Sequence, residues 1–184
     1  MTFIFGYAVP LGLLLSLGIS GISVYTDIKE RKIPNVLIGI GLLVGCITQL
    51  SLYGPSGLWE GVLGLLTAFF LTILFYILGG LGAGDVKLLM VIGLLSDPLT
   101  VFSVFFWVAM TGGVLSIAMM LLSKKGFQSW KNFKHFFLSL LYLKQVPRFD
   151  ETKSVTLPYA IPIFLGVLIV VIIGNLEFSL PVFW

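Results

Sequence analysis

Long apolar stretches recur along this 184-residue chain, and they constrain its fold more than any other feature. A run of about 17–25 apolar residues is long enough to cross the hydrocarbon core of a membrane as a helix. Five such runs occupy residues 3–25, 36–53, 60–79, 99–122 and 156–176. The apolar run 86–95 is too short to cross alone, but with the glycine-rich residues before it, it can form a sixth span with irregular first turns. Irregular backbone at membrane depth is tolerated where it faces protein or a wet cavity.

The composition supports a membrane location. Hydrophobic residues make up 58% of the chain and charged residues only 10%. A soluble domain has about 25% charged residues, because its surface must face water. The length indicates a single domain, residues 1–184. No basic residue precedes Lys29, so the N-terminus does not resemble a cleaved signal peptide, and the first apolar run is expected to remain as a span.

The distribution of basic residues predicts the orientation. All eleven basic residues fall in the segments 26–35, 80–87 and 123–155. With six spans and the N-terminus outside, all three segments lie in the cytoplasm, as the positive-inside rule requires. Five spans, without 86–95, would divide them between the two sides. The sequence therefore predicts an all-α, polytopic bundle of about six transmembrane helices with both termini outside. The net charge of +3 is attributed to this topology and to contacts with anionic membrane lipids, and not to nucleic-acid binding.

The polar segment 123–155 is predicted to be a cytoplasmic interfacial loop. Within it, aromatic and aliphatic residues recur at helical spacing against Lys131, Lys134 and Lys144. This pattern is typical of an amphipathic helix lying in the membrane interface. Its role is a passive anchor or, alternatively, a surface that guides substrate. His135 lies here and is expected to face solvent or lipid headgroups.

The inventory of reactive side chains excludes several protease classes. The chain has one histidine, His135, and one cysteine, Cys46, which lies inside an apolar run. Neither a serine–histidine triad nor a typical zinc site can be assembled from them, and no HExxH motif occurs. We therefore expect no metal and no cofactor. Two aspartates remain, Asp27 and Asp85, each at the predicted cytoplasmic end of a span.

Two neighbouring aspartates are sufficient for peptide hydrolysis. Carboxylates about 3 Å apart cannot both ionise easily, so the pair holds a shared proton. The ionised member accepts a proton from water as the water attacks the peptide carbonyl, and the protonated member donates to the developing oxyanion. Because the pKa values belong to the pair, neither role is assigned here to Asp27 or to Asp85.

Glycines directly precede the second aspartate, at Gly79, Gly80, Gly82 and Gly84. Glycine permits positive φ angles and close approach of backbone to backbone, so this loop is expected to bring Asp85 against Asp27. The alternative is that these glycines only pack helices tightly.

Lys87, two residues after Asp85, is predicted to lower the pKa of that aspartate or to contact a lipid phosphate. Pro34 and Asn35 are expected to form a turn and the N-cap of the second span, a structural role.

Three segments resemble the type IV prepilin peptidases, members of the wider GxGD group of aspartyl proteases. They are Asp27–Asn35, GAGDVKLL from Gly82 to Leu89, and Pro158-Tyr159 near the last span. The GxGD pattern appears as Gly82-Ala83-Gly84-Asp85. The resemblance implies a six-helix endopeptidase of the cell membrane that removes the leader of type IV pilin-like (prepilin or Flp-type) precursors at the cytoplasmic face. It also implies that Asp27 and Asp85 are catalytic and that Gly82, Gly84 and Lys87 belong to the supporting loop.

Longer members of that family carry an N-terminal cytoplasmic region, often with two CxxC pairs, that is associated with methylation of the new N-terminus. This sequence begins directly with a span and resembles the short forms found with tight-adherence (Flp) pili. We therefore expect peptidase activity without N-methyltransferase activity. Archaeal preflagellin peptidases are also short and related, so the filament type stays open.

Two other classes of membrane protein remain as alternatives. An ion- or proton-coupled transporter is expected to place its acids near mid-span, whereas Asp27 and Asp85 lie at span ends. A structural membrane subunit gives no reason for the glycine-rich loop before Asp85.

Overall fold

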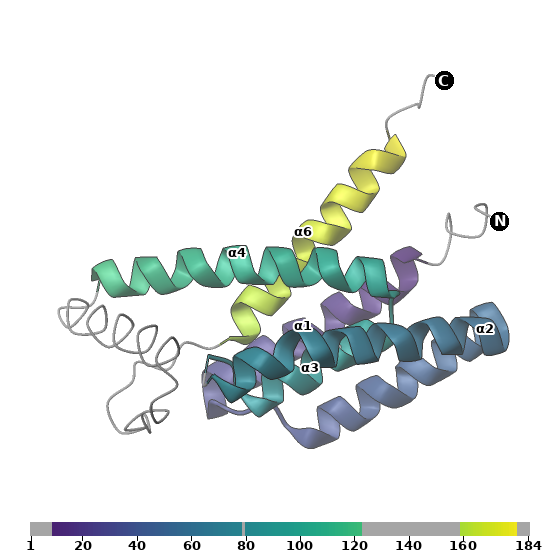
Figure 1. Cartoon of the computed structure of the whole chain (residues 1–184), viewed down its shortest axis with the longest axis horizontal. Helices are drawn as coiled ribbons and strands as arrows, with labels where there is room; N and C mark the ends of the chain where they lie inside the picture. The colour runs from purple at the N-terminus through teal and green to yellow at the C-terminus, as the bar shows by residue number, and fades with distance from the viewer. Residues whose placement is uncertain (1–8, 79, 123–158, 180–184) are drawn as a thin grey trace. The chain divides into compact units, whose positions relative to one another are not determined.

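Every regular element in the described part of the chain is an α-helix (Figure 1). The computed structural model describes residues 9–78, 80–122 and 159–179. The helices are α1 (Val9–Glu30), α2 (Asn35–Ile77), α3 (Ala83–Leu94), α4 (Pro98–Leu122) and α6 (Ala160–Ser179). The prediction of an all-α fold is confirmed for these residues. The amphipathic helix predicted within 123–155 lies outside the described residues.

Three of the described helices are long and apolar enough to cross a membrane. The candidate spans are Leu11–Glu30, Asn35–Ile77 and Pro98–Ala118, whereas the described apolar part of α6, Ala160–Ile173, is shorter. Large apolar side chains such as Leu43, Phe70 and Phe106 are exposed on these helices, as expected where lipid covers the surface. The predicted number of spans and their orientation stay predictions.

Helix α2 contains a sharp reversal of the chain. A straight helix of its 43 residues would measure about 65 Å, roughly twice the thickness of a membrane core. Gly54 (φ 67°, ψ −157°) is non-helical and is followed by Pro55, which has no backbone N–H to donate. Figure 1 shows the chain turning back on itself at this point. The halves before and after Gly54 occupy the two apolar runs predicted at 36–53 and 60–79.

Helix α3 packs against both halves of α2. A Cβ added to Gly41 would lie 2.6 Å from Cγ1 of Val91, and one on Gly61 would lie 2.6 Å from the carbonyl oxygen of Leu94. These glycines therefore allow a separation that no larger residue permits. Gln49 adds a polar link, because its Nε2 donates to the carbonyl oxygens of Leu94 (2.9 Å) and Ser96 (3.2 Å) at the C-terminal end of α3. The last carbonyl groups of a helix have no hydrogen-bond partner within the helix, so the Gln49 side chain supplies a donor that they would otherwise lack.

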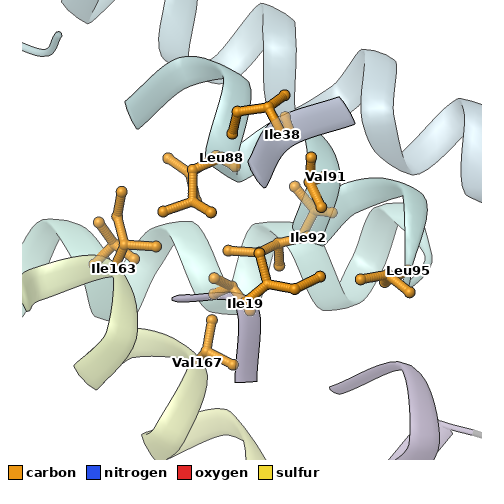
Figure 2. Packing of buried hydrophobic residues seen from close by; sticks show 13 residues of the cluster. Ile19, Ile38, Leu88, Val91, Ile92, Leu95, Ile163 and Val167 are labelled. Atoms are coloured by element: carbon orange, nitrogen blue, oxygen red, sulfur yellow. The ribbon is translucent and has the colours of Figure 1, made fainter. Parts of the chain in front are cut away.

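An apolar cluster surrounds α3 and fixes its position (Figure 2). Leu88, Val91 and Ile92 of α3 are at most 1% exposed. Leu95, directly after α3, also belongs to the cluster. The other labelled members come from other helices: Ile19 of α1, Ile38 of α2, and Ile163 and Val167 of α6. A helix that is apolar on all sides is stable where protein surrounds it, so a 12-residue helix is held here by its neighbours.

The chain divides into two compact units, one formed by residues 1–112 with 158–184 and the other by 113–157. Every residue of the candidate site described below belongs to the first unit. In the second unit the described residues, 113–122, are the C-terminal turns of α4. The single domain expected over 1–184 stays a prediction.

Candidate active site

The last turn of α1 carries Asp27. The helix ends at Glu30, and Arg31 takes a left-handed conformation (φ 52°) while its N–H donates to the carbonyl oxygen of Asp27 at 2.8 Å. This is a common way to end a helix and turn the chain, although glycine usually occupies the left-handed position. The Asp27 side chain is only 9% exposed, and its Oδ2 accepts a hydrogen bond from the backbone N–H of Ala160 at 3.3 Å.

The first turn of α3 carries Asp85, which is 8% exposed. Gly82 is the N-cap residue, in an extended conformation, and its N–H donates to Oδ2 of Asp85 at 3.0 Å. In a capping box, the acidic side chain at the third helical position accepts a hydrogen bond from the backbone N–H of the N-cap residue, and Asp85 and Gly82 form this bond. A local hydrogen bond therefore fixes the direction of the Asp85 side chain.

The glycines before Asp85 allow neighbouring atoms to approach closely, but none of those that the structure describes has a left-handed backbone conformation. Of the two properties that glycine permits, positive φ is not used at Gly80, Gly82 or Gly84, and Gly79 lies outside the described residues. A Cβ on Gly82 would lie 2.9 Å from Oδ2 of Asp85, and one on Gly84 would lie 3.2 Å from Cβ of Ile33. The segment is extended at Gly82 and already helical at Gly84, which leaves no place for a left-handed residue.

Asp27 and Asp85 line the same cavity, of about 330 Å³. The remaining lining residues come from the segment between α1 and α2 and from the start of each following helix: Arg31, Lys32, Ile33, Asn35, Gly82, Ala83, Gly84 and Lys87. Ligand pockets measure about 300–1,000 Å³, so this cavity is in the size range of a ligand site. The structure thus brings together the two aspartates and the supporting residues Gly82, Gly84 and Lys87 that the sequence singled out.

The environment of Asp85 favours its protonated form. Asp85 lies in the segment 80–87, outside the candidate membrane spans. Burial of the carboxyl raises its pKa from 3.8 to about 6; the hydrogen bond from Gly82 lowers the pKa, and the negative charge of Asp27 raises it. A carboxyl group with a pKa near the working pH can donate a proton and take it back during a reaction.

Lys87 links two helices at the mouth of this site. Its Nζ donates to Oδ1 of Asn35 at 3.0 Å, which joins the first turn of α3 to the first turn of α2. The expected N-cap role of Asn35 is wrong: Pro34 occupies the N-cap position, and Asn35 is the first helical residue. The Asn35 side chain is therefore available to accept from a lysine 52 positions later in the chain.

Sequence reasoning missed the contribution of α6. Ala160 supplies a hydrogen bond to Asp27, and its neighbour Tyr159 lies close enough to Asp85 to interact with it electrostatically. The pair Pro158-Tyr159 was noted only as part of a resemblance. A backbone N–H has no sequence signature, because every residue except proline carries one.

Comparison with known families gives one match. The model of a family described as the type IV leader peptidase family matches residues 13–117, more than half of the chain. The matched range includes both Asp27 and Asp85. Comparisons with curated proteins and with solved structures gave no significant match.

Proposed function

Because this chain belongs to the type IV leader peptidase family, we propose that it removes the leader peptide from type IV pilin-like precursors. Family membership makes it a peptidase, and its apolar helices indicate a membrane protein. The observation that carries the proposal is the shared cavity of Asp27 and Asp85, two buried acids from different helices. We assign both as the catalytic residues of an aspartic endopeptidase.

The proposed reaction is an attack of water on the scissile peptide carbonyl. One ionised aspartate takes a proton from the water, while the protonated aspartate donates its proton to the carbonyl oxygen, giving a neutral tetrahedral intermediate. Collapse of this intermediate passes a proton to the departing amine, and the pair again holds a single proton. In both aspartates the backbone hydrogen bond engages Oδ2. We assign the two Oδ1 atoms to the water and the substrate carbonyl.

The size of the cavity limits what it can hold. One water needs only about 10–15 Å³ of such space, so a cavity of about 330 Å³ holds the nucleophilic water beside a short peptide segment. The rest of a precursor must lie outside it. In the proposal, the apolar helix of the pilin-like substrate stays in the lipid and only the cleavage site enters the cavity.

The distribution of basic residues supports a cytoplasmic location of the site. Arg31, Lys32 and Lys87, which line the cavity, belong to the segments that the positive-inside rule assigns to the cytoplasm. We propose that the protein resides in the cell membrane, cleaves on its cytoplasmic face, and does not methylate the product. The proposed substrate is a pilin-like precursor of the prepilin or Flp type, and preflagellin is the related alternative.

Co-expression with a candidate pilin-like precursor tests the proposal, in a host that has no such peptidase of its own. Mass spectrometry of the product should show the mature pilin, cut only at the end of its leader, with no methyl group on the new N-terminus. Asp27→Asn and Asp85→Asn should each lower the cleavage rate by about 10²–10⁴-fold while the protein still accumulates in the membrane.

Asp97→Asn is the matched control. Asp97 accepts hydrogen bonds from the N–H groups of Leu99 and Thr100 at the start of α4, and asparagine can replace it as an N-cap. This variant should cleave like the wild type. Full activity of Asp27→Asn or Asp85→Asn would rule out the assignment of the aspartate pair.

A further inference from the structure

We propose that the turn at the start of α6 is a third part of the active site, in which the backbone N–H of Ala160 holds the Asp27 carboxyl group in the orientation that the reaction needs. The inference rests on the proposed function only in that the reaction is peptide hydrolysis by these two aspartates. It assigns Ala160 as a positioning residue, because it acts through Asp27.

The geometry at the α6 terminus supports this assignment. The Ala160 N–H donates to Oδ2 of Asp27 at 3.3 Å, and both residues are buried, Ala160 fully and Asp27 at 9% exposure. Ala160 is the first residue of α6. The first N–H groups of a helix have no partner within the helix, and their combined dipole attracts negative charge. Asp27 therefore accepts a hydrogen bond from the N-terminal end of α6.

Packing between α1 and α6 holds the two residues in place. The two helices are in contact, and a Cβ on Gly21 of α1 would make an ordinary van der Waals contact, at 3.5 Å, with the ring of Phe164. Ser20 and Ser23, which precede Asp27 on α1, are fully buried, and their hydroxyls donate to carbonyl oxygens of α1 itself. The contact between α1 and α6 thus brings the first N–H of α6 to Asp27.

The other aspartate has a different environment. Asp85 accepts from Gly82 within its own helix and interacts electrostatically with Tyr159. Its carboxyl has a pKa of about 6, chiefly because of burial. Among the described residues, the charged groups that share the cavity with Asp27 are Asp85 and Lys87 on α3 and Arg31 and Lys32 after α1. Two consecutive residues, Tyr159 and Ala160, therefore reach both aspartates, and the N–H of Ala160 distinguishes Asp27 from its partner.

An amide-to-ester substitution at Ala160 tests the proposal. Replacing alanine by its α-hydroxy acid, through suppression in cell-free synthesis into liposomes, removes the N–H and keeps the side chain. We expect kcat/KM for precursor cleavage to fall about 10- to 100-fold, as for loss of a hydrogen bond to a charged group. The loss should fall on kcat, with KM within about twofold of the wild type, because Ala160 contacts Asp27 and not the substrate.

Two variants control for the structural effect of the ester. Ala160→Gly keeps the N–H and should lose much less kcat than the Ala160 ester. An ester at Ile161 removes the next N–H of α6, which makes no hydrogen bond to Asp27 within the described part of the chain, and it should also lose much less kcat. Equal losses of kcat in the two ester variants would mean that Ala160 has only a structural role and would overturn the proposal.

A second readout does not depend on cleavage. Infrared spectroscopy of protein labelled with ¹³C in its aspartate carboxyl groups follows the carboxyl band of Asp27, identified by its loss in Asp27→Asn. The frequency of this band should differ between the Ala160 ester and the wild type, because the carboxyl group loses a hydrogen bond, and an unchanged frequency would overturn the proposal. If the wild type cleaved no precursor, the proposed function would fail, while the band frequency would still decide whether the Ala160 N–H binds Asp27.

Discussion

Gly64 of α2 and Gly93 of α3 meet backbone against backbone. A Cβ on Gly93 would lie 2.5 Å from the carbonyl oxygen of Gly64, and a Cβ on Gly64 would clash with the carbonyl oxygen of Gly93. Gly93 lies at the C-terminal end of a 12-residue helix whose first turn carries Asp85. Because that helix is short and straight, a shift at Gly93 is passed along it to Asp85.

Gly93→Ala should therefore harm both stability and cleavage. The added methyl group meets backbone atoms, which cannot rotate away, and overpacking of this kind costs about 1–3 kcal/mol. We expect a lower thermal unfolding temperature in detergent micelles and slower precursor cleavage. Gly39→Ala, on an exposed part of α2 with open space at its Cβ, is the matched control and should be at least as stable as the wild type. Equal behaviour of the two variants would contradict this account of the contact.

Gln49→Leu should destabilise the end of α3. The substitution keeps the volume but removes the donor to the carbonyl oxygens of Leu94 and Ser96, and a buried carbonyl without a partner costs about 1–3 kcal/mol. Thermal unfolding in micelles measures the loss. Ser56→Ala, which removes an exposed hydroxyl at the reversal of α2, should change stability by less than about 0.5 kcal/mol. A Gln49→Leu variant as stable as Ser56→Ala would show that the link contributes nothing.

Lys87 and Asn35 should behave as a coupled pair. Each single substitution, Lys87→Ala or Asn35→Ala, removes the same hydrogen bond between α3 and α2, so each should lower kcat/KM by about 2- to 10-fold. The double variant should be no worse than the more affected single variant, because contacting residues are not additive. Multiplicative losses in the double-mutant cycle would mean that the two side chains act independently.

Asp85 should make the stability of the protein depend on pH. Its pKa rises from 3.8 to about 6 on folding, so the folded protein binds a proton between these values that the unfolded chain does not. The wild type should therefore be most stable below pH 3.8 with respect to this group, and lose stability as pH rises through 6. A shift of this size corresponds to about 3 kcal/mol.

The Asp85→Asn variant isolates this effect. It should be more stable than the wild type at pH 7, and the difference should shrink as the pH falls toward 4, as measured by unfolding in micelles over a pH series. A constant difference across that range would show that another group causes the pH dependence. Asp97→Asn serves again as the control, and it should follow the wild type at every pH.

The helices of this protein could be predicted with little information beyond apolar run length. The runs 36–53 and 60–79 correspond to the two halves of α2, and 86–95 corresponds to α3. Local details were less predictable. The connection around Gly54 is a sharp kink, and the Asn35 side chain binds Lys87 instead of capping its own helix. Local patterns indicate which conformations a residue tolerates, but the partner of a side chain depends on which distant segment packs beside it.

The sequence by itself determined that this chain is helical and apolar, that basic residues gather in three segments, and that two acids stand at the ends of apolar runs. Those properties depend on the length and periodicity of local segments, which are visible in one dimension. Only the tertiary structure placed Asp27 and Asp85 on one cavity and brought the N–H of Ala160 to Asp27. Close packing of α2 against α3 through Gly41, Gly61, Gly64 and Gly93 positions the helix that carries Asp85. Every residue but proline has a backbone N–H, so packing alone decides which of them reaches a carboxylate.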